Sequence, residues 1–157
     1  MEVYKPPVYP TLYDTTSIFL AGSIEMDKAK RWQDDFVKEF EKLEKSYGKG
    51  EKYVLLNPRR DDWDSSWKQE ISNAQFYQQV EWELTFLERA DYKVFYFAEN
   101  TMSPVTLLEL GRFSEDGQSF VLVEDGYLRK GNVDIFCHRY RIPVFNSIEA
   151  IIKEILL

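Results

Sequence analysis

The stretch Asn100–Arg112, which reads NTMSPVTLLELGR, is the part of the sequence that most constrains the fold. Pro104 suits the first turn of a helix, because its missing N–H would have no helical partner there. Ser103 directly before it can cap that end. At about 100° per residue, the leucines that follow spread over most of the helix circumference, which is typical of a buried helix. Glu109 therefore has no obvious solvated face.

Two interpretations of Glu109 remain open from this stretch alone. A buried carboxylate costs free energy unless it is partnered or used. The structural interpretation is an ion pair with Arg112, one turn further on. The functional interpretation is a reactive carboxylate held by a rigid helix, and the rest of the chain must decide between the two.

Short apolar runs alternate with amphipathic segments on both sides of this stretch. We expect strands at residues 17–21, 53–56, 91–97, 119–123 and 142–145. Besides the helix that begins at Pro104, we expect helices at residues 28–47, 75–89, 133–139 and 148–156. Residues 1–16 contain three prolines and form an extended arm. The alternation predicts one α/β domain over residues 1–157, with a doubly wound, five-stranded parallel sheet covered on both faces.

In a sheet of this kind, ligands bind beyond the carboxyl ends of the strands. Gly22 and Ser23 follow the first expected strand, and Asn57 follows the second. Asn100–Ser103 follow the third strand, and residues 124–132 follow the fourth. The topology therefore brings these segments, which are distant in sequence, to one rim.

The loop after the second strand, NPRRDDWDSSW, has no clear period. Loops of about a dozen residues inside a compact domain are usually functional or disordered. Arg59 and Arg60 suit a phosphate or a base carbonyl, and Trp63 suits stacking on a base. The alternative for the two arginines is pairing with the aspartates of the same loop, which are Asp61, Asp62 and Asp64.

A second inward carboxylate is expected on the helix at residues 75–89. Glu83 falls inside the apolar stripe of this helix, between Val80 and Leu87. Glu83 and Glu109 thus come from the two helices that flank the third strand. Paired carboxylates in a partly dry site suit glycosidic chemistry, with one as nucleophile and the other for proton handling or positioning.

Composition narrows the class of protein. The 157 residues carry a formal net charge of −7, which disfavours a nucleic-acid partner. No segment approaches roughly 18 consecutive apolar residues, so we expect no membrane span. His138 is the only histidine and Cys137 the only cysteine, so we expect no metal site and no internal disulfide. The N-terminus lacks the basic and apolar parts of a signal peptide, and we expect a cytoplasmic location.

Four segments together resemble one known family. They are SIFLAGSI, LNPRRDDWD, QVEWEL with the following ERAD, and the T-x-SP-x-TLLELG helix, in this order within Ser17–Phe145. They are similar to the nucleoside 2-deoxyribosyltransferase family, in particular its divergent branch. The resemblance implies a flavodoxin-like (Rossmann-like) three-layer α/β fold. It also implies cleavage of the N-glycosidic bond of a nucleoside or deoxynucleoside, with no cofactor.

The resemblance assigns roles to residues of this sequence. Glu109 matches the family's nucleophile, and Glu83 matches the carboxylate associated with the base and its proton transfers. Gly22 and Ser23 match the turn that lines the sugar. Asn132 matches an asparagine that a neighbouring subunit often delivers to the 5′ end of the sugar. A homo-oligomer with shared active sites is therefore expected, acting on small nucleosides, nucleotides and nucleobases.

The sequence departs from the family's pattern at two positions. Ser103 stands where typical members carry an aspartate, and the strand at 17–21 lacks their tyrosine. Relatives in the superfamily hydrolyse nucleoside 5′-monophosphates, and Ser23 and Ser103 suit donation to phosphate oxygens. Three hypotheses follow: a deoxyribosyltransferase, a nucleotide or nucleoside N-glycoside hydrolase, and a non-catalytic nucleotide-binding module.

Overall fold

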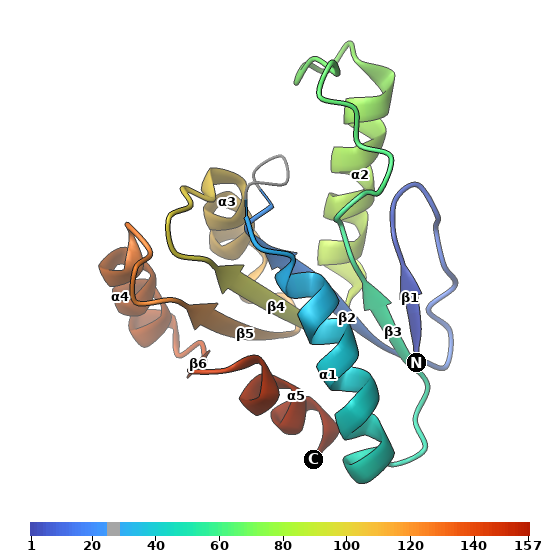
Figure 1. Ribbon diagram of the computed structural model, residues 1–157, viewed down its shortest axis with the longest axis vertical. Coiled ribbons are helices and arrows are strands. Elements are labelled where there is room, and N and C mark those ends of the chain that lie inside the picture. The colour runs from blue at the N-terminus through green and yellow to red at the C-terminus, as the bar shows by residue number, and fades with distance from the viewer. Residues whose placement is uncertain (25–28) are drawn as a thin grey trace.

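The computed structural model describes residues 1–24 and 29–157. Its strands are β1 (Glu2–Tyr4), β2 (Thr16–Gly22), β3 (Tyr53–Leu56), β4 (Tyr92–Phe97), β5 (Gln118–Val123) and β6 (Val144–Phe145). Its helices are α1 (Trp32–Tyr47), α2 (Ala74–Arg89), α3 (Pro104–Phe113), α4 (Lys130–Tyr140) and α5 (Ile148–Leu156) (Figure 1). The first helix begins at Trp32, and residues 29–31 before it are not helical. The predicted start at Lys28 lies outside the described residues. None of the described helices combines the length and the apolar character that a membrane span requires.

The six strands form one parallel sheet in the order β1-β3-β2-β4-β5-β6. The predicted α/β, flavodoxin-like fold with a doubly wound sheet is confirmed, but the sheet has six strands and not five. The additional strand is β1, which pairs Glu2–Tyr4 with Val54–Leu56 of β3. Three residues at an edge, directly before the prolines of the arm, are too short to give a visible alternation of apolar and polar side chains.

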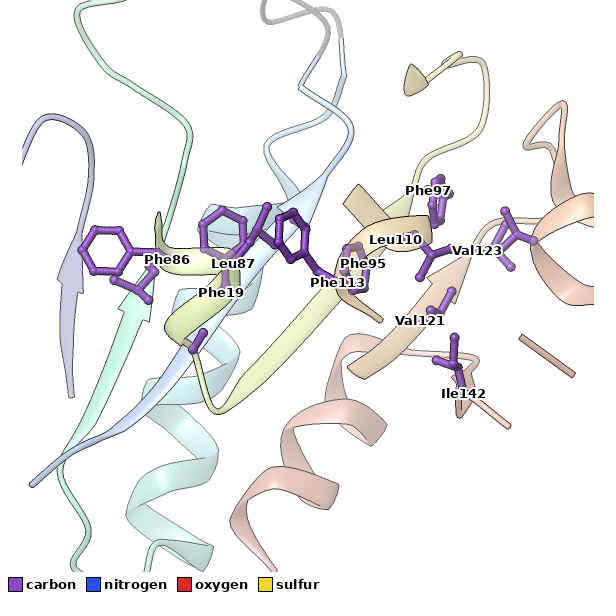
Figure 2. Packing of buried hydrophobic residues seen from close by; sticks show 14 of the residues in the cluster. Phe19, Phe86, Leu87, Phe95, Phe97, Leu110, Phe113, Val121, Val123 and Ile142 are labelled. Atoms are coloured by element: carbon purple, nitrogen blue, oxygen red, sulfur yellow. The ribbon is translucent and has the colours of Figure 1, made fainter. Parts of the chain in front are cut away.

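Helices cover both faces of the sheet, so the molecule has three layers. Along β2, Ile18 and Leu20 pack in one cluster with α1 and α5, whereas Phe19 and Ala21 pack in the other with α2, α3 and α4. This alternation follows from the two-residue period of a strand. In the second cluster, the helix residues Phe86, Leu87, Leu110 and Phe113 lie over the strand residues Phe19, Phe95 and Val121 (Figure 2).

The direction of the connections reverses beside β2. The chain passes from β2 through α1 to β3 on one side, and α2 then returns it to β4 on the other side. At such a switch point the connections leave a crevice outside the carboxyl ends of the strands. Helix α2 projects past this edge, and residues 57–73 run beside it (Figure 1). The start of α2 is fixed by Asn73, whose side-chain oxygen accepts a hydrogen bond from the Phe76 N–H at 2.9 Å.

Candidate active site

A cleft of about 570 Å³ lies at the switch point, with α2 and α3 as its walls. That volume is in the range of small-molecule sites. Its lining consists of residues 21–24, 58–60, 63, 69, 76, 79, 80, 83, 102–106 and 109. The described residues contain no group of three His, Cys, Asp or Glu side chains arranged to hold a metal ion.

Most of the residues predicted for the site line this cleft. They are Gly22, Ser23, Arg59, Arg60, Trp63, Glu83, Ser103 and Glu109. Asn57 is buried outside the lining, and its side-chain oxygen accepts a hydrogen bond from the Arg59 N–H at 2.9 Å. Asn132 is exposed in the first turn of α4, so a single chain does not bring it to the cleft.

Glu109 lies on the cleft side of α3 and is only 8% exposed. Arg112 does not neutralise it, because that guanidinium pairs with Asp116 at 2.9 Å on the exposed side. Among the residues that the structure describes, Glu109 has no ion pair. Burial raises the pKa of Glu109 well above its usual range, and the negative charge of Glu83 raises it further.

Glu83 faces the same cleft from α2. Removal from bulk water raises its pKa to about 7, against the lowering effect of a hydrogen bond from the side chain of Gln79. The Gln79 Nε2 lies 2.7 Å from Glu83 Oε1. Two like charges in a site with little water disfavour each other, so the two acids titrate as a pair. The pair therefore holds one proton over an intermediate range of pH.

A cluster of buried hydroxyl groups forms the other end of the cleft. Thr101 Oγ1 lies 3.0 Å from Ser23 Oγ and 2.9 Å from Ser103 Oγ, and the two serine hydroxyls also bond to each other. The backbone N–H of Ala98 donates to Ser23 Oγ at 3.1 Å. These bonds hold the turns after β2 and β4 together directly before α3.

Ser103 does not cap α3 as its sequence position suggested. It adopts the left-handed conformation with φ of 46°, and its side chain makes no capping hydrogen bond to the helix. Its hydroxyl instead joins the cluster with Ser23 and Thr101. The predicted start of the helix at Pro104 is confirmed.

The two arginines of the loop after β3 differ in their partners. The buried guanidinium of Arg59 donates to the carbonyl oxygens of Ala29 and Lys30, each at 3.2 Å, and thereby braces the segment before α1. Arg60 pairs with Asp62 at 2.6 Å, which is the loop pairing considered from sequence. Its guanidinium also lies 4.9 Å from the ring centroid of Trp67.

Gly22 is required by close packing at the end of β2. A Cβ atom there would lie 2.6 Å from the Trp32 ring and 2.7 Å from the Tyr96 carbonyl oxygen. Sequence reasoning missed two other residues of the site, Gln79 and Thr101. Gln79 precedes Glu83 by one helical turn, and that spacing on the same face is the signal that points to it.

The fold and the cleft define an α/β protein with two coupled carboxylates at the switch point of its sheet. The chain belongs to the nucleoside 2-deoxyribosyltransferase-like family, whose model, described as "Nucleoside 2-deoxyribosyltransferase like", matches residues 15–127. The match spans β2 to β5 and includes Glu83 and Glu109. A search of curated proteins finds no match to the chain.

Proposed function

We propose that this protein cleaves the N-glycosidic bond of a 2′-deoxynucleoside through Glu109 and transfers the sugar to a second base. The observation that carries the proposal is the pair of electrostatically coupled carboxylates, Glu83 and Glu109, in one cleft at the switch point. Membership of the family supports nucleosides as the substrate class. The cleft acids are the groups that this chemistry needs, a nucleophile and a proton carrier.

The state with one proton on the pair has the correct proton count for the reaction. Burial raises the pKa of both acids, so the pair retains a proton that either carboxylate can hold. Positive charge that develops at the anomeric carbon stabilises the ionised form of Glu109. Glu83 then holds the proton and stands beside the leaving base, which needs it.

Each step of the proposed reaction balances. A Glu109 carboxylate oxygen attacks C1′, the C1′–N bond breaks, and its electron pair leaves with the base, which takes the proton of Glu83. The product is a covalent glycosyl ester of Glu109. A second base attacks C1′, loses its N–H proton to Glu83 and releases Glu109. Two displacements at C1′ give net retention of configuration.

The test is incubation of deoxynucleosides with and without a second free base, followed by chromatography. A new nucleoside that forms only with the acceptor base supports the transferase. Glu109→Ala must abolish the exchange, and Glu88→Ala, an exposed acid on α2, is the matched control. Unchanged exchange in Glu109→Ala contradicts the mechanism. Binding of nucleosides without any cleavage points instead to a non-catalytic module.

A second candidate function is hydrolysis of a nucleoside 5′-monophosphate. The hydroxyls of Ser23 and Ser103 favour it, because they line the cleft at the N-terminus of α3, where an anion is stabilised. Base release without an acceptor, faster from the monophosphate than from the nucleoside, supports this function. Ser103→Asp adds a negative charge there and should reverse the preference.

We also propose that the active site is completed by a neighbouring copy. The proposal is supported by the position of Asn132, which is exposed and outside the cleft of its own chain. Dilution should then lower the specific activity as the oligomer dissociates. Constant activity down to a monomer, measured by light scattering, contradicts the shared site.

A further inference from the structure

Gln79 is the buried amide of the cleft, and only half of its hydrogen-bonding capacity is used. It is 5% exposed, and its Nε2 donates to the Pro58 carbonyl oxygen at 2.9 Å and to Glu83 Oε1 at 2.7 Å. A carbonyl oxygen can only accept, so this geometry fixes which end of the amide is nitrogen. The remaining atom, Oε1, is buried and has no partner among the described residues. A buried acceptor left in this state is costly unless a ligand satisfies it.

The position of Gln79 places this acceptor beside the base of a bound nucleoside. Gln79 lies four residues before Glu83 on α2, which is about 6 Å along the helix. In the pose that the proposed reaction requires, C1′ lies at Glu109 and the base points toward α2, where Glu83 and Gln79 line the same cleft. Phe76 and Trp63 also line that part of the cleft.

Trp63 supplies the complementary donor. Its Nε1 is likewise buried without a partner among the residues that the structure describes. An acceptor and a donor that are both unused match a ligand edge on which a donor stands next to an acceptor. Adenine and cytosine have such an edge, because an exocyclic amino group stands beside an unprotonated ring nitrogen.

A base that binds in the same pose with a carbonyl group in place of the amino group fits less well. Its oxygen would face Gln79 Oε1, and the Pro58 carbonyl and Glu83 Oε1 nearby are acceptors as well. Acceptors facing one another repel, and no donor remains on the Gln79 amide, since both of its N–H bonds are used.

We propose that Gln79 selects nucleobases that carry an exocyclic amino group, by accepting its N–H with Oε1 while Nε2 holds Glu83. This inference rests on the proposed function for the class of substrate. One amide thus joins recognition of the base to the position of the acid that protonates it. Gln79 is a specificity-determining and positioning residue, and Glu109 and Glu83 carry the chemistry.

The test measures binding in Glu109→Ala, which cannot turn over. The probes are 2′-deoxyadenosine against purine 2′-deoxyriboside, and 2′-deoxycytidine against its analogue without the 4-amino group, titrated by calorimetry. Loss of the amino group should weaken binding about tenfold to a hundredfold in the pair that binds more tightly. Adding Gln79→Met should reduce that difference to about twofold or less, because methionine keeps the shape without the acceptor. Gln75→Met, an exposed glutamine on the same helix, is the control and should leave the difference unchanged.

Binding and turnover give separate answers. Equal discrimination in the Gln79→Met and Gln75→Met proteins, with both folded by circular dichroism, overturns the role of Gln79. The role of Gln79 is also overturned if the protein that retains Gln79 binds nucleosides with and without the amino group equally tightly. If the protein that retains Glu109 releases no base from any of the four nucleosides, while discrimination in binding is still lost on adding Gln79→Met to Glu109→Ala, the proposed reaction is contradicted and selection by Gln79 is supported.

Discussion

Glu124 and the two cleft acids occupy the same edge of the sheet but have opposite electrostatic environments. Glu124 directly follows β5, and its Oε1 accepts from the Tyr96 hydroxyl at 2.6 Å and pairs with the Lys30 ammonium. Its Oε2 accepts from the Glu99 N–H at 2.7 Å. Burial opposes ionisation, but these three donors together hold the pKa of Glu124 below its usual range.

The two cleft acids are buried, but they have too few hydrogen-bond donors to offset the cost of burying their charge. Glu83 has one hydrogen bond, from Gln79, and Glu109 has no ion pair among the described residues. Their pKa values are raised where that of Glu124 is lowered. Partners, and not the residue type or the edge of the sheet, therefore decide whether the pKa of a buried carboxylate is lowered or raised.

The largest expected effect is that of removing Glu109. Glu109→Ala should lower base exchange by about a thousandfold or more, because it removes the proposed nucleophile. Thermal stability should not fall, since none of the described cations pairs with Glu109. Exchange measured by chromatography and melting followed by circular dichroism check both statements. A variant that melts much earlier and keeps its exchange rate would assign Glu109 to the fold, like Glu124.

Glu83→Gln should have the next largest effect. The amide keeps the shape but cannot carry the proton, so turnover should fall roughly a hundredfold to ten-thousandfold. Substrates whose base leaves without protonation should lose much less. Comparison of a natural deoxynucleoside with one that carries an activated leaving group measures this difference. Equal losses for the two substrates would contradict proton transfer by Glu83.

The pH dependence follows from the raised pKa values of the pair. As the pH falls through about 7, the pKa of Glu83, both acids become protonated and the ionised nucleophile is lost. At high pH both acids ionise, and no proton remains for the base. The kcat/KM profile should therefore be bell-shaped, with its acid limb near pH 7.

Gln79→Met should move only one limb of that profile. The hydrogen bond from Gln79 lowers the pKa of Glu83, so its loss should shift the acid limb to higher pH. The other charged groups that line the cleft are Glu109 of α3 and the arginines Arg59 and Arg60, and all remain in this variant. An acid limb that stays in place, as in the Gln75→Met control, would contradict the coupling of Gln79 to Glu83.

Sequence reasoning reached the fold because the signals there are periodic. The run at 53–56 is apolar throughout and coincides with β3, and the phase of α2 placed Glu83 toward the interior correctly. The sequence-based prediction missed β1, because this strand forms by pairing with Val54–Leu56 and its own three residues carry no pattern. The hydrogen bonds of Arg59 to the Ala29 and Lys30 carbonyls could not be predicted, because backbone acceptors leave no pattern in the sequence of side chains.

The charged residues of the site could be predicted from the sequence, but its buried polar atoms without a hydrogen-bond partner could not. A carboxylate within an apolar stripe is visible in the sequence, as at Glu83. The unpartnered oxygen of Gln79 depends on where Pro58 places its carbonyl, which requires coordinates. Ser103 illustrates the same limit, because its left-handed backbone directs the hydroxyl to Thr101 and away from the helix.

The smallest expected effect is that of Glu124→Gln, which tests the other side of the comparison. The amide loses the ion pair with Lys30, which is half exposed and screened by solvent, so the free energy of unfolding should fall by only about 1 kcal/mol at pH 7. Base exchange should stay within about twofold of the unsubstituted protein, since Glu124 does not line the cleft. A lowered pKa stabilises the fold above the usual pKa of a glutamate, and that contribution disappears as the pH falls through the lowered value. Urea denaturation of both proteins at pH 7 and at pH 3 should therefore show a smaller difference at pH 3 than at pH 7. A difference that persists undiminished at pH 3 would mean that packing, and not charge, makes Glu124 stabilising.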